Sequence, residues 1–332
     1  MEDTSKCPPS SPSSGDMILI VSPIFKKGGR EKTMRTRLIF GLIAAFALAV
    51  WPATAQTKAP KVYISVDMEG IWGVVHGDQV SAAGEGYGAA RRWMAEDVNA
   101  VIAGLREAGA GEIVVNDSHG GMKNIVADQL DKTVSLISGT PKPLGMMEGI
   151  DASFDAVVFV GYHARAGSFP GILDHTISGA TVYAIKVNGR ELPEMGLNAA
   201  IAGHFKVPVV MLTGDTVTCA QAHELFGPSI TTVAVKDAVG RVAARMLPRS
   251  EALAKLKAGA KKALEGRAQA KPWVLGPPLS FEIEYHNSGQ SELPTLLAGV
   301  KRLGPRAVGF SANDYLEGFK LLRALIALGG VS

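Results

Sequence analysis

The chain has 332 residues, of which 47% are hydrophobic, so it is long enough to bury one large core or two smaller ones. Its formal charge of +3 is unevenly distributed. Residues 1–55 hold seven of the 34 Lys/Arg residues and four of the 31 Asp/Glu residues, which leaves 27 of each from residue 56 onward. That balance, without any stripe of basic and aromatic residues, argues against a nucleic-acid-binding protein.

The first patterned segment has the features of a secretory leader. Residues 34–55 combine Met34, two arginines, an apolar run and the small-residue site Ala53-Thr54-Ala55. This pattern predicts a signal peptide that is cleaved after Ala55 during export, which places the protein in the periplasm. The alternative is an uncleaved membrane anchor, but the apolar run is short for a transmembrane helix.

The segment before this leader has a different character. Residues 1–33 are rich in Ser and Pro and precede the basic residues with which a signal peptide begins. We therefore expect translation to start at Met34 and interpret 1–33 as an artefactual or disordered extension. Cys7 lies in that extension, so Cys219 is the one thiol after the leader. We expect it to be a buried, apolar residue of a helix rather than half of a disulfide.

Strand and helix patterns alternate in the following part of the chain. The apolar runs predict strands at 61–66, 112–117, 133–138, 154–161, 207–215 and 231–237. Helical periodicity is present at 88–109, at 194–205 and around Cys219. Residues 180–194 are typical of a hairpin, with Asn188-Gly189 as its turn. Strands that alternate with helices predict an α/β fold, with a mainly parallel sheet and helices on both of its faces.

The pattern changes after residue 237. Residues 248–270 are rich in Ala, Lys and Glu and are expected to be helical, followed by strands at 279–287 and 306–314 and a helix to about Leu328. We therefore predict a larger α/β domain over 56–237 and a smaller C-terminal α+β domain over 238–332.

Acidic and imidazole side chains recur where the predicted strands end. Asp67 and Glu69 follow the first strand, His119 the second and His163 the strand at 154–161, while Glu194 begins a helix. Ligands bind at the carboxyl ends of strands in open α/β sheets, and these side chains suit zinc or a similar divalent ion. Because residues i and i+2 of an extended segment point the same way, the carboxylates of Asp67 and Glu69 are expected to converge.

Each of these residues also has a purely structural interpretation. Asp67 and Glu69 fit a turn or a helix cap, and His119 fits a turn beside Asp117. His163 fits a structural histidine, and Glu194 fits an acid that complements a helix dipole. Their coincidence at the strand ends favours the metal site. Another histidine, His175, lies in a loop twelve residues after His163, close enough in the chain to face the same site.

Seven short motifs occur in the order and spacing of one peptidase family. They are SVDMEGIWG, VNDSHGGMKN, SGTPKPLGMMEGI, VFVGYHARAG, PGILDHT, VNGRELPEMGLNA and VPVVMLTGD. Through them the chain resembles the D-aminopeptidase family of zinc metallopeptidases, of the dipeptide-operon type. The resemblance runs from Lys61 to the C-terminus and is strongest over 62–237.

The resemblance implies a role for each candidate residue. Asp67 is similar to the carboxylate that bridges two zinc ions in this family, and the remaining ligands correspond to Glu69, His119, His163 and Glu194. His175 resembles the catalytic histidine. The implied activity is zinc-dependent removal of N-terminal amino acids, of the D form in this family, from short peptides by a metal-activated water; the residues themselves leave the preference for D- or L-residues open. Whether His175 stabilises the oxyanion, moves a proton to the leaving amine or acts as the nucleophile stays open.

The family also implies a fold and an assembly. The fold is a doubly wound α/β domain with a smaller second domain, and the assembly is a homo-oligomer, a ring-based decamer around a central chamber. Two features depart from the family pattern. The loop between His163 and His175 is one residue longer, which affects the expected substrate preference, and the chain carries an export leader, after whose removal no membrane contact is expected.

Two other functions are compatible with the pattern of residues. A dinuclear site also hydrolyses phosphate esters or other amides, but the chain has no glycine-rich phosphate cradle. An exported peptide-binding protein would fit the leader and the α/β pattern, yet such a protein has little use for a cluster of metal ligands.

Overall fold

The computed structural model describes residues 22–24 and 58–331, and the chain from Lys58 onward forms one compact unit. The predicted signal peptide at 34–55, and all but 22–24 of the predicted extension, lie outside the described residues. Within the described part, none of the helices has the length and apolar character needed to cross a membrane.

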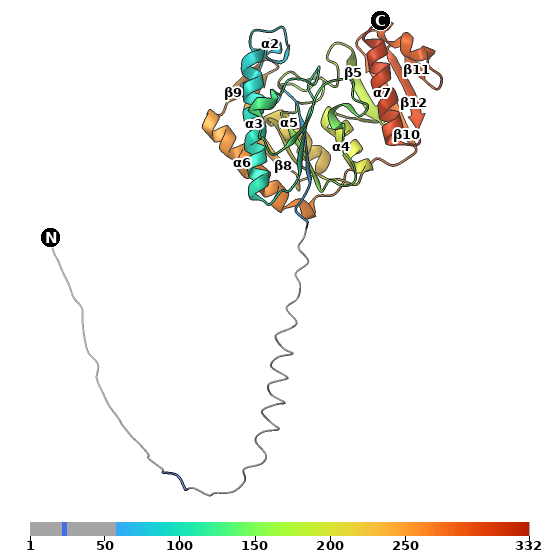
Figure 1. Cartoon of the computed structure of the whole chain (residues 1–332). Coiled ribbons are helices and arrows are strands. Elements are labelled where there is room, and N and C mark those ends of the chain that lie inside the picture. Colours follow the sequence, from blue (N-terminus) through green and yellow to red (C-terminus); the bar gives the residue numbers. More distant parts are fainter. Residues whose placement is uncertain (1–21, 25–57, 332) are drawn as a thin grey trace, which may run out of the picture. The chain divides into compact units, whose positions relative to one another are not determined.

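A seven-stranded sheet forms the centre of this unit (Figure 1). Its strand order is β3-β2-β1-β4-β7-β8-β9, and only β9 runs antiparallel to its neighbour. The strands are β1 (Val62–Val66), β2 (Ile113–Asp117), β3 (Ser135–Ile137), β4 (Ala156–Val160), β7 (Val209–Asp215), β8 (Thr231–Gly240) and β9 (Ala243–Met246). The predicted mainly parallel sheet is therefore confirmed.

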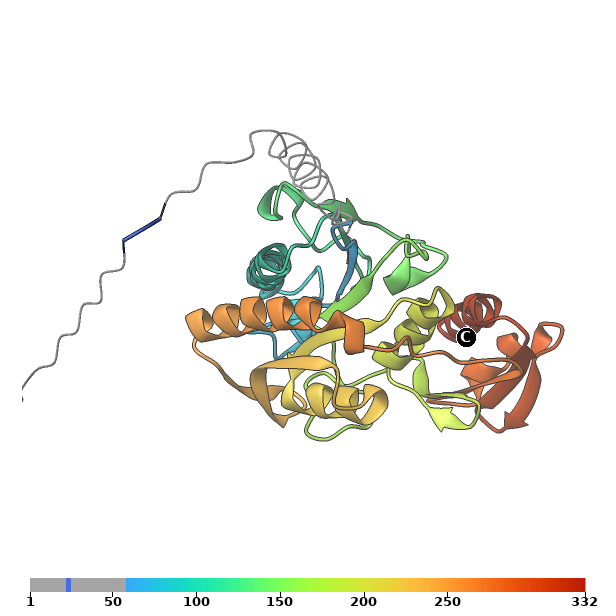
Figure 2. The same ribbon diagram turned by 90° about the horizontal axis from the view of Figure 1, so that it is seen from below.

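Two long helices cover one face of this sheet. α3 (Tyr87–Glu107) and α6 (Arg249–Glu265) lie side by side, and their apolar residues pack on Val62, Ile64 and Val66 of β1 (Figure 2). The helices approach closely at Gly104, where a Cβ atom would lie 2.0 Å from the carbonyl oxygen of Lys257. Glycine at this position therefore allows the two helices to pack together.

The opposite face is covered by α4 (Glu194–His204) and α5 (Thr216–Phe226). Tyr63 and Phe159 point to this side, since alternate residues of a strand face opposite ways. Cys219 of α5 is a buried free thiol in the same core, as expected, and burial raises its pKa to about 12. Helices on both faces confirm the predicted α/β architecture.

A second, antiparallel sheet has the strand order β11-β12-β10-β5-β6. Its strands are β5 (Val182–Val187), β6 (Arg190–Glu191), β10 (Leu279–Tyr285), β11 (Lys301–Gly304) and β12 (Ala307–Ala312). Asn188 and Gly189 both have positive φ angles, +52° and +76°, as the predicted hairpin turn requires. The final helix α7 (Tyr315–Gly329) packs on this sheet and against α4 (Figure 1).

The two sheets do not divide at residue 237, where the sequence suggested a domain boundary. β8 continues to Gly240 and pairs with β9, and α6 packs against α3, so residues up to 265 belong with the first sheet. Conversely, the β5–β6 hairpin pairs with β10 of the second sheet. The chain thus crosses between the sheets more than once. The first sheet includes a strand from after residue 237, and the second sheet includes two strands from before it.

Short elements connect these layers, namely α2 (Gly77–Val80) and the 3₁₀ turns η1 (Ala127–Gln129), η2 (Gly145–Met147), η3 (Arg267–Gln269), η4 (Gly289–Ser291) and η5 (Leu293–Leu296). The strand order reverses at β1, which pairs with β2 on one side and with β4 on the other. A doubly wound sheet leaves a crevice at the carboxyl ends of such neighbouring strands. The loops after β1, β2 and β4 therefore meet at one place.

Candidate metal centre

The loop after β1 carries Asp67 and Glu69, both nearly inaccessible to solvent. β1 ends at Val66, and the chain then enters a bend and a turn. The turn is fixed against β4: the Asp67 amide donates to Val160 O at 2.8 Å, and a Cβ at Gly70 would lie 2.0 Å from Tyr162 O. The two carboxylates converge as expected, but through this turn and not through the alternation of an extended strand.

A buried lysine holds the same loop in place. Lys236 of β8 is fully inaccessible, and its Nζ donates to the carbonyl oxygens of Glu69 at 2.6 Å, Ile71 at 2.9 Å and Val74 at 2.5 Å. Burial lowers the pKa of Lys236 to about 7. Lys236 was not predicted from the sequence, although a lysine within the apolar run of a buried strand is a signal for such a supporting residue.

The loop after β2 is organised by Asp117. Its carboxylate accepts hydrogen bonds from the backbone amides of Asn124 at 2.5 Å and Ile125 at 2.7 Å and from Asn124 Nδ2 at 2.8 Å. Asn124 Nδ2 also donates to the carbonyl oxygen of His119 at 2.7 Å. Asp117 therefore shapes the turn, and the His119 side chain is left for another role.

The ring of His119 is oriented by one hydrogen bond. Its Nε2 donates to Val80 O at 2.8 Å, and its Nδ1 lies 3.2 Å from Asp67 Oδ1 and 3.1 Å from Glu69 Oε2. With a proton on Nε2, the lone pair of Nδ1 points at two carboxylates, which is the arrangement of a histidine that ligates a cation.

His163, after β4, repeats this arrangement in a more enclosed position. Its Nδ1 donates to Ala164 O at 3.0 Å, and its Nε2 lies 3.4 Å from Asp67 Oδ2 and 3.2 Å from Glu194 Oε1. The neighbouring Arg165 does not partner it, since Arg165 pairs with Glu191. The interpretation of His163 as a structural histidine has little support in these contacts.

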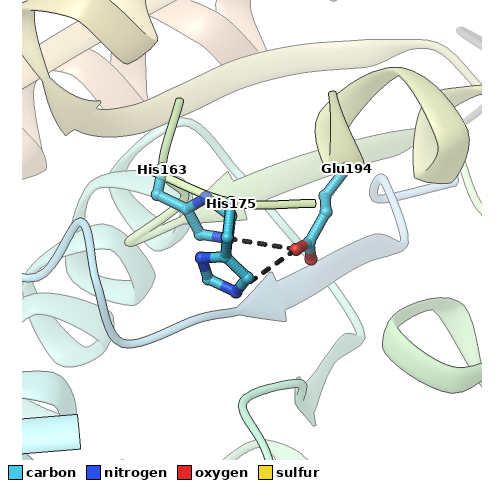
Figure 3. A group of neighbouring side chains, drawn as sticks. All are labelled: His163, His175 and Glu194. Carbon is cyan, nitrogen blue, oxygen red and sulfur yellow. Dashed lines mark ion pairs between the residues drawn. The ribbon is translucent and has the colours of Figure 1, made fainter. Parts of the chain in front are cut away.

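The third imidazole belongs to His175 (Figure 3). Its Nδ1 donates to Leu173 O at 2.8 Å, and its Nε2 lies 3.6 Å from Glu194 Oε1. The ring stacks on that of His163, with centroids 3.9 Å apart and planes inclined by 10°. Glu194 is the first residue of α4 and also accepts a hydrogen bond from Ile177 N at 2.5 Å. The structure thus brings together all six residues that the sequence singled out.

The donor set fits a divalent metal. Two overlapping groups have ligand atoms within 4.8 Å of one another, one formed by Asp67, Glu69 and His163 and the other by His163, His175 and Glu194. Within the described residues, Asp67 Oδ2 and His163 Nε2 are buried without a hydrogen-bond partner. Such atoms are rare in folded proteins unless an ion or water satisfies them. Carboxylate oxygens and imidazole nitrogens are the ligands that zinc accepts.

The pKa values of the cluster reflect its three buried carboxylates. Burial, and then the charge of Glu69, raise the pKa of Asp67 to about 7. Burial opposes a charge on His163, but Glu194 and Asp67 outweigh it and raise its pKa to about 10. For His119, Glu69 and Asp67 likewise outweigh burial and raise the pKa well above its usual value. Positive charge is therefore strongly favoured between these carboxylates.

A cavity of about 190 Å³ opens onto the cluster. Asp67, His119, His175 and Glu194 line it, together with Arg323 from α7. His175 also lines a second cavity of about 360 Å³, whose arginines are already in ion pairs with acidic residues. The cluster is thus accessible to a small ligand from the side of the first cavity.

The remaining histidines lie in other surroundings. His76 caps α2, His204 is exposed and lies 3.5 Å from Asp314, His223 contacts Thr232, and His286 packs on Tyr183. These four histidines therefore serve packing or surface contacts and do not belong to the cluster.

Comparison with known proteins agrees with this arrangement. The D-aminopeptidase family model matches residues 61–324. A D-aminopeptidase of Bacillus subtilis (strain 168) is 37% identical over 272 residues, which are 81% of this chain and 97% of that protein. A solved structure of the "Zn-dependent D-aminopeptidase DppA from Bacillus subtilis, a self-compartmentalizing protease" matches with a TM-score of 0.80 and 36% identity, over 82% of this chain and 98% of the other. The chain is therefore an enzyme of the D-aminopeptidase family, as its motifs predicted.

Proposed function

We propose that the chain is a zinc-dependent aminopeptidase that removes N-terminal D-amino acids from short peptides at a dinuclear site. The observation that carries the two-ion proposal is the position of Asp67 between two imidazoles, with Oδ1 3.2 Å from His119 Nδ1 and Oδ2 3.4 Å from His163 Nε2. Within the described residues, Asp67 Oδ2 and His163 Nε2 are also buried without a hydrogen-bond partner. The zinc dependence and the D-specificity rest on the relatives described above.

Each residue of the cluster has a distinct proposed role. Asp67 has one carboxylate oxygen toward His119 and the other toward His163, a position suited to a carboxylate that bridges two ions. The other proposed ligands are Glu69, His119, His163 and Glu194. Their orientation is fixed by the surrounding hydrogen bonds, such as those from His119 to Val80 O and from His163 to Ala164 O.

His175 is the proposed catalytic residue. Among the described residues, Glu194 is the one carboxylate within 4.0 Å of its ring, at 3.6 Å. The His175 side chain is 19% exposed, whereas that of His163 is 1% exposed. The hydrogen bond from Nδ1 to Leu173 O leaves Nε2 to accept a proton and to return it to the leaving amine. Bound zinc would supply an acidified water as nucleophile and polarise the scissile carbonyl.

The test is hydrolysis of D-Ala-D-Ala and L-Ala-L-Ala by the purified protein, with metal content measured on the same sample. We expect cleavage of the D-dipeptide and about two zinc ions per chain. Bound zinc with hydrolysis of phosphodiesters alone would favour a different dinuclear hydrolase. Absence of both metal and hydrolysis would favour a peptide-binding protein.

The setting of this activity is also proposed. The leader at 34–55 supports export to the periplasm, and N-terminal sequencing of the protein from a periplasmic extract should begin at Gln56. A relative is described as self-compartmentalizing, which supports a homo-oligomer and, by the family resemblance, a ring-based decamer. Light scattering on the purified protein measures the number of chains, and a monomer would contradict this proposal.

A further inference from the structure

Arg323 brings a positive charge into the cavity beside the metal ligands. It lies on α7, one turn after Phe319, so the two side chains share a face of the helix. Both line the cavity of about 190 Å³ that Asp67, His175 and Glu194 also line. The cavity thus has the ligand cluster in one part of its wall and a guanidinium group in another.

The guanidinium is held in place without being neutralised. Its Nη1 donates to the carbonyl oxygen of Lys142 at 2.6 Å. No carboxylate in residues 22–24 or 58–331 lies within 4.0 Å of it. The acid that most affects it, Glu148, accepts a hydrogen bond from Leu144 N at 2.7 Å, and burial still lowers the pKa of Arg323. A guanidinium has five N–H donors, so Arg323 retains donors for a ligand.

The backbone at Gly145 leaves room for the Arg323 side chain. Gly145 lines the same cavity, and a Cβ atom there would lie only 2.6 Å from Arg323 Nη1. Its φ angle of +56° also favours glycine. Asn116 Nδ2 donates to Gly145 O at 3.1 Å and fixes this backbone in place. The position of the guanidinium is therefore part of the built wall and not that of a loose surface side chain.

We propose that Arg323 binds the C-terminal α-carboxylate of the peptide substrate and thereby selects dipeptides with a free C-terminus. This inference rests on the proposed function, since it places the scissile amide between the metal ligands and the guanidinium. Arginine binds carboxylates through paired, charge-assisted hydrogen bonds. The cavity is smaller than the roughly 300–1,000 Å³ of sites for drug-sized ligands, which suits a ligand the size of a dipeptide.

The test compares D-Ala-D-Ala with D-Ala-D-alaninamide, which share the scissile bond and differ only at the C-terminus. For the wild-type protein we expect kcat/KM to be about 10- to 100-fold higher for the free acid, the range of a charge-assisted hydrogen bond. Arg323→Gln should lose that advantage through a higher KM for the acid and leave the amide nearly unchanged. Lys320→Gln, an exposed position on the same helix, is the matched control and should preserve the preference.

Calorimetry separates this inference from the proposed function. Both ligands are titrated into His175→Gln, with and without Arg323→Gln. The His175→Gln change slows hydrolysis, so that the heat of binding is measured without the heat of turnover. Tighter binding of the acid, lost with Arg323→Gln, supports the subsite even if the wild-type protein hydrolyses neither compound. Equal binding of acid and amide overturns it, as does an equal loss of kcat/KM for both substrates in Arg323→Gln.

Discussion

Charged side chains have different surroundings at the carboxyl end of the parallel sheet and on the antiparallel sheet. In the first region Asp67, Glu69 and Glu194 are buried together, with imidazoles as their neighbours. On the second sheet, Lys186 and Glu282 form a partly exposed ion pair across neighbouring strands. Burying like charges lowers the stability of a protein unless a bound ligand compensates for them, whereas a partly exposed ion pair contributes little to stability. The comparison supports the proposal that the function lies in the first region.

The largest expected effect comes from Asp67→Asn, which tests whether the buried charges exist for metal. We expect the protein to lose bound metal and turnover to fall by on the order of 10⁴-fold or more, because the whole centre depends on this carboxylate. In metal-free protein the same change should raise Tm, since it removes one of three crowded carboxylates. Metal analysis, D-dipeptide hydrolysis and thermal unfolding measure the three quantities.

Asp97→Asn is the matched control for that variant. Asp97 is equally buried, but it pairs with Arg249 and accepts a hydrogen bond from Trp72 N. We expect this variant to lose about 1–3 kcal/mol of stability and to keep its metal. If both variants lost stability and both kept metal, the distinction between a functional and a structural buried carboxylate would be wrong.

His175→Gln should have the next largest effect. We expect metal to stay bound while kcat falls by about 10²- to 10⁴-fold, the usual contribution of a positioned acid–base group. His204→Gln is the control, because His204 is exposed at the end of α4, and its turnover should equal that of the wild-type protein. Loss of metal from His175→Gln would reassign His175 as a ligand.

Lys142 tests how much stability the protein loses when it buries a single charge. This residue lies between the end of β2 and helix α7. Its Nζ donates to Asn116 Oδ1 at 2.5 Å and Asp117 O at 2.7 Å, and burial lowers its pKa from 10.5 to about 8. Glu148 and Asp117 oppose this shift, and Arg323 adds to it. Between pH 8 and 10.5 the unfolded chain keeps a proton that the folded chain has released, so the free energy of unfolding rises with pH.

The expected gain over this pH range is about 1–3 kcal/mol relative to Lys142→Met, which has no such proton. Denaturant unfolding of both proteins between pH 7.5 and 10.5 measures it. Parallel stability curves for the two proteins would show that Lys142 titrates normally.

Most of the fold was predictable because apolar periodicity is a local property of the sequence. The strands at 61–66, 112–117 and 207–215 correspond to β1, β2 and β7, which are fully buried. β9 and β11 were missed, since both are short and mostly exposed and depend on pairing with β8 and β12. Strand pairing between distant segments carries no such local signal.

The candidate site was predictable to the same extent. Asp67, His119 and His163 follow strands whose ends meet at one edge of the sheet, so the sequence pattern brings them together. Lys236 and Arg323 were not found, because their roles depend on which carbonyl groups or cavity the fold places beside them. The sequence thus predicts the candidate metal ligands, but it does not predict the residues that support or extend the site.

The smallest expected effect is that of Lys186→Ala on the antiparallel sheet. Lys186 lies directly opposite Glu282, with Nζ 2.9 Å from Oε1, and each side chain is 33% exposed. Water and salt screen such a pair, so we expect a loss of about 0.5 kcal/mol that shrinks further in 1 M NaCl. Denaturant unfolding at low and high salt measures this loss. A salt-independent loss above about 2 kcal/mol would mean that the pair behaves as a buried ion pair. The two regions would then differ in the number of charges they hold and not in how water solvates those charges.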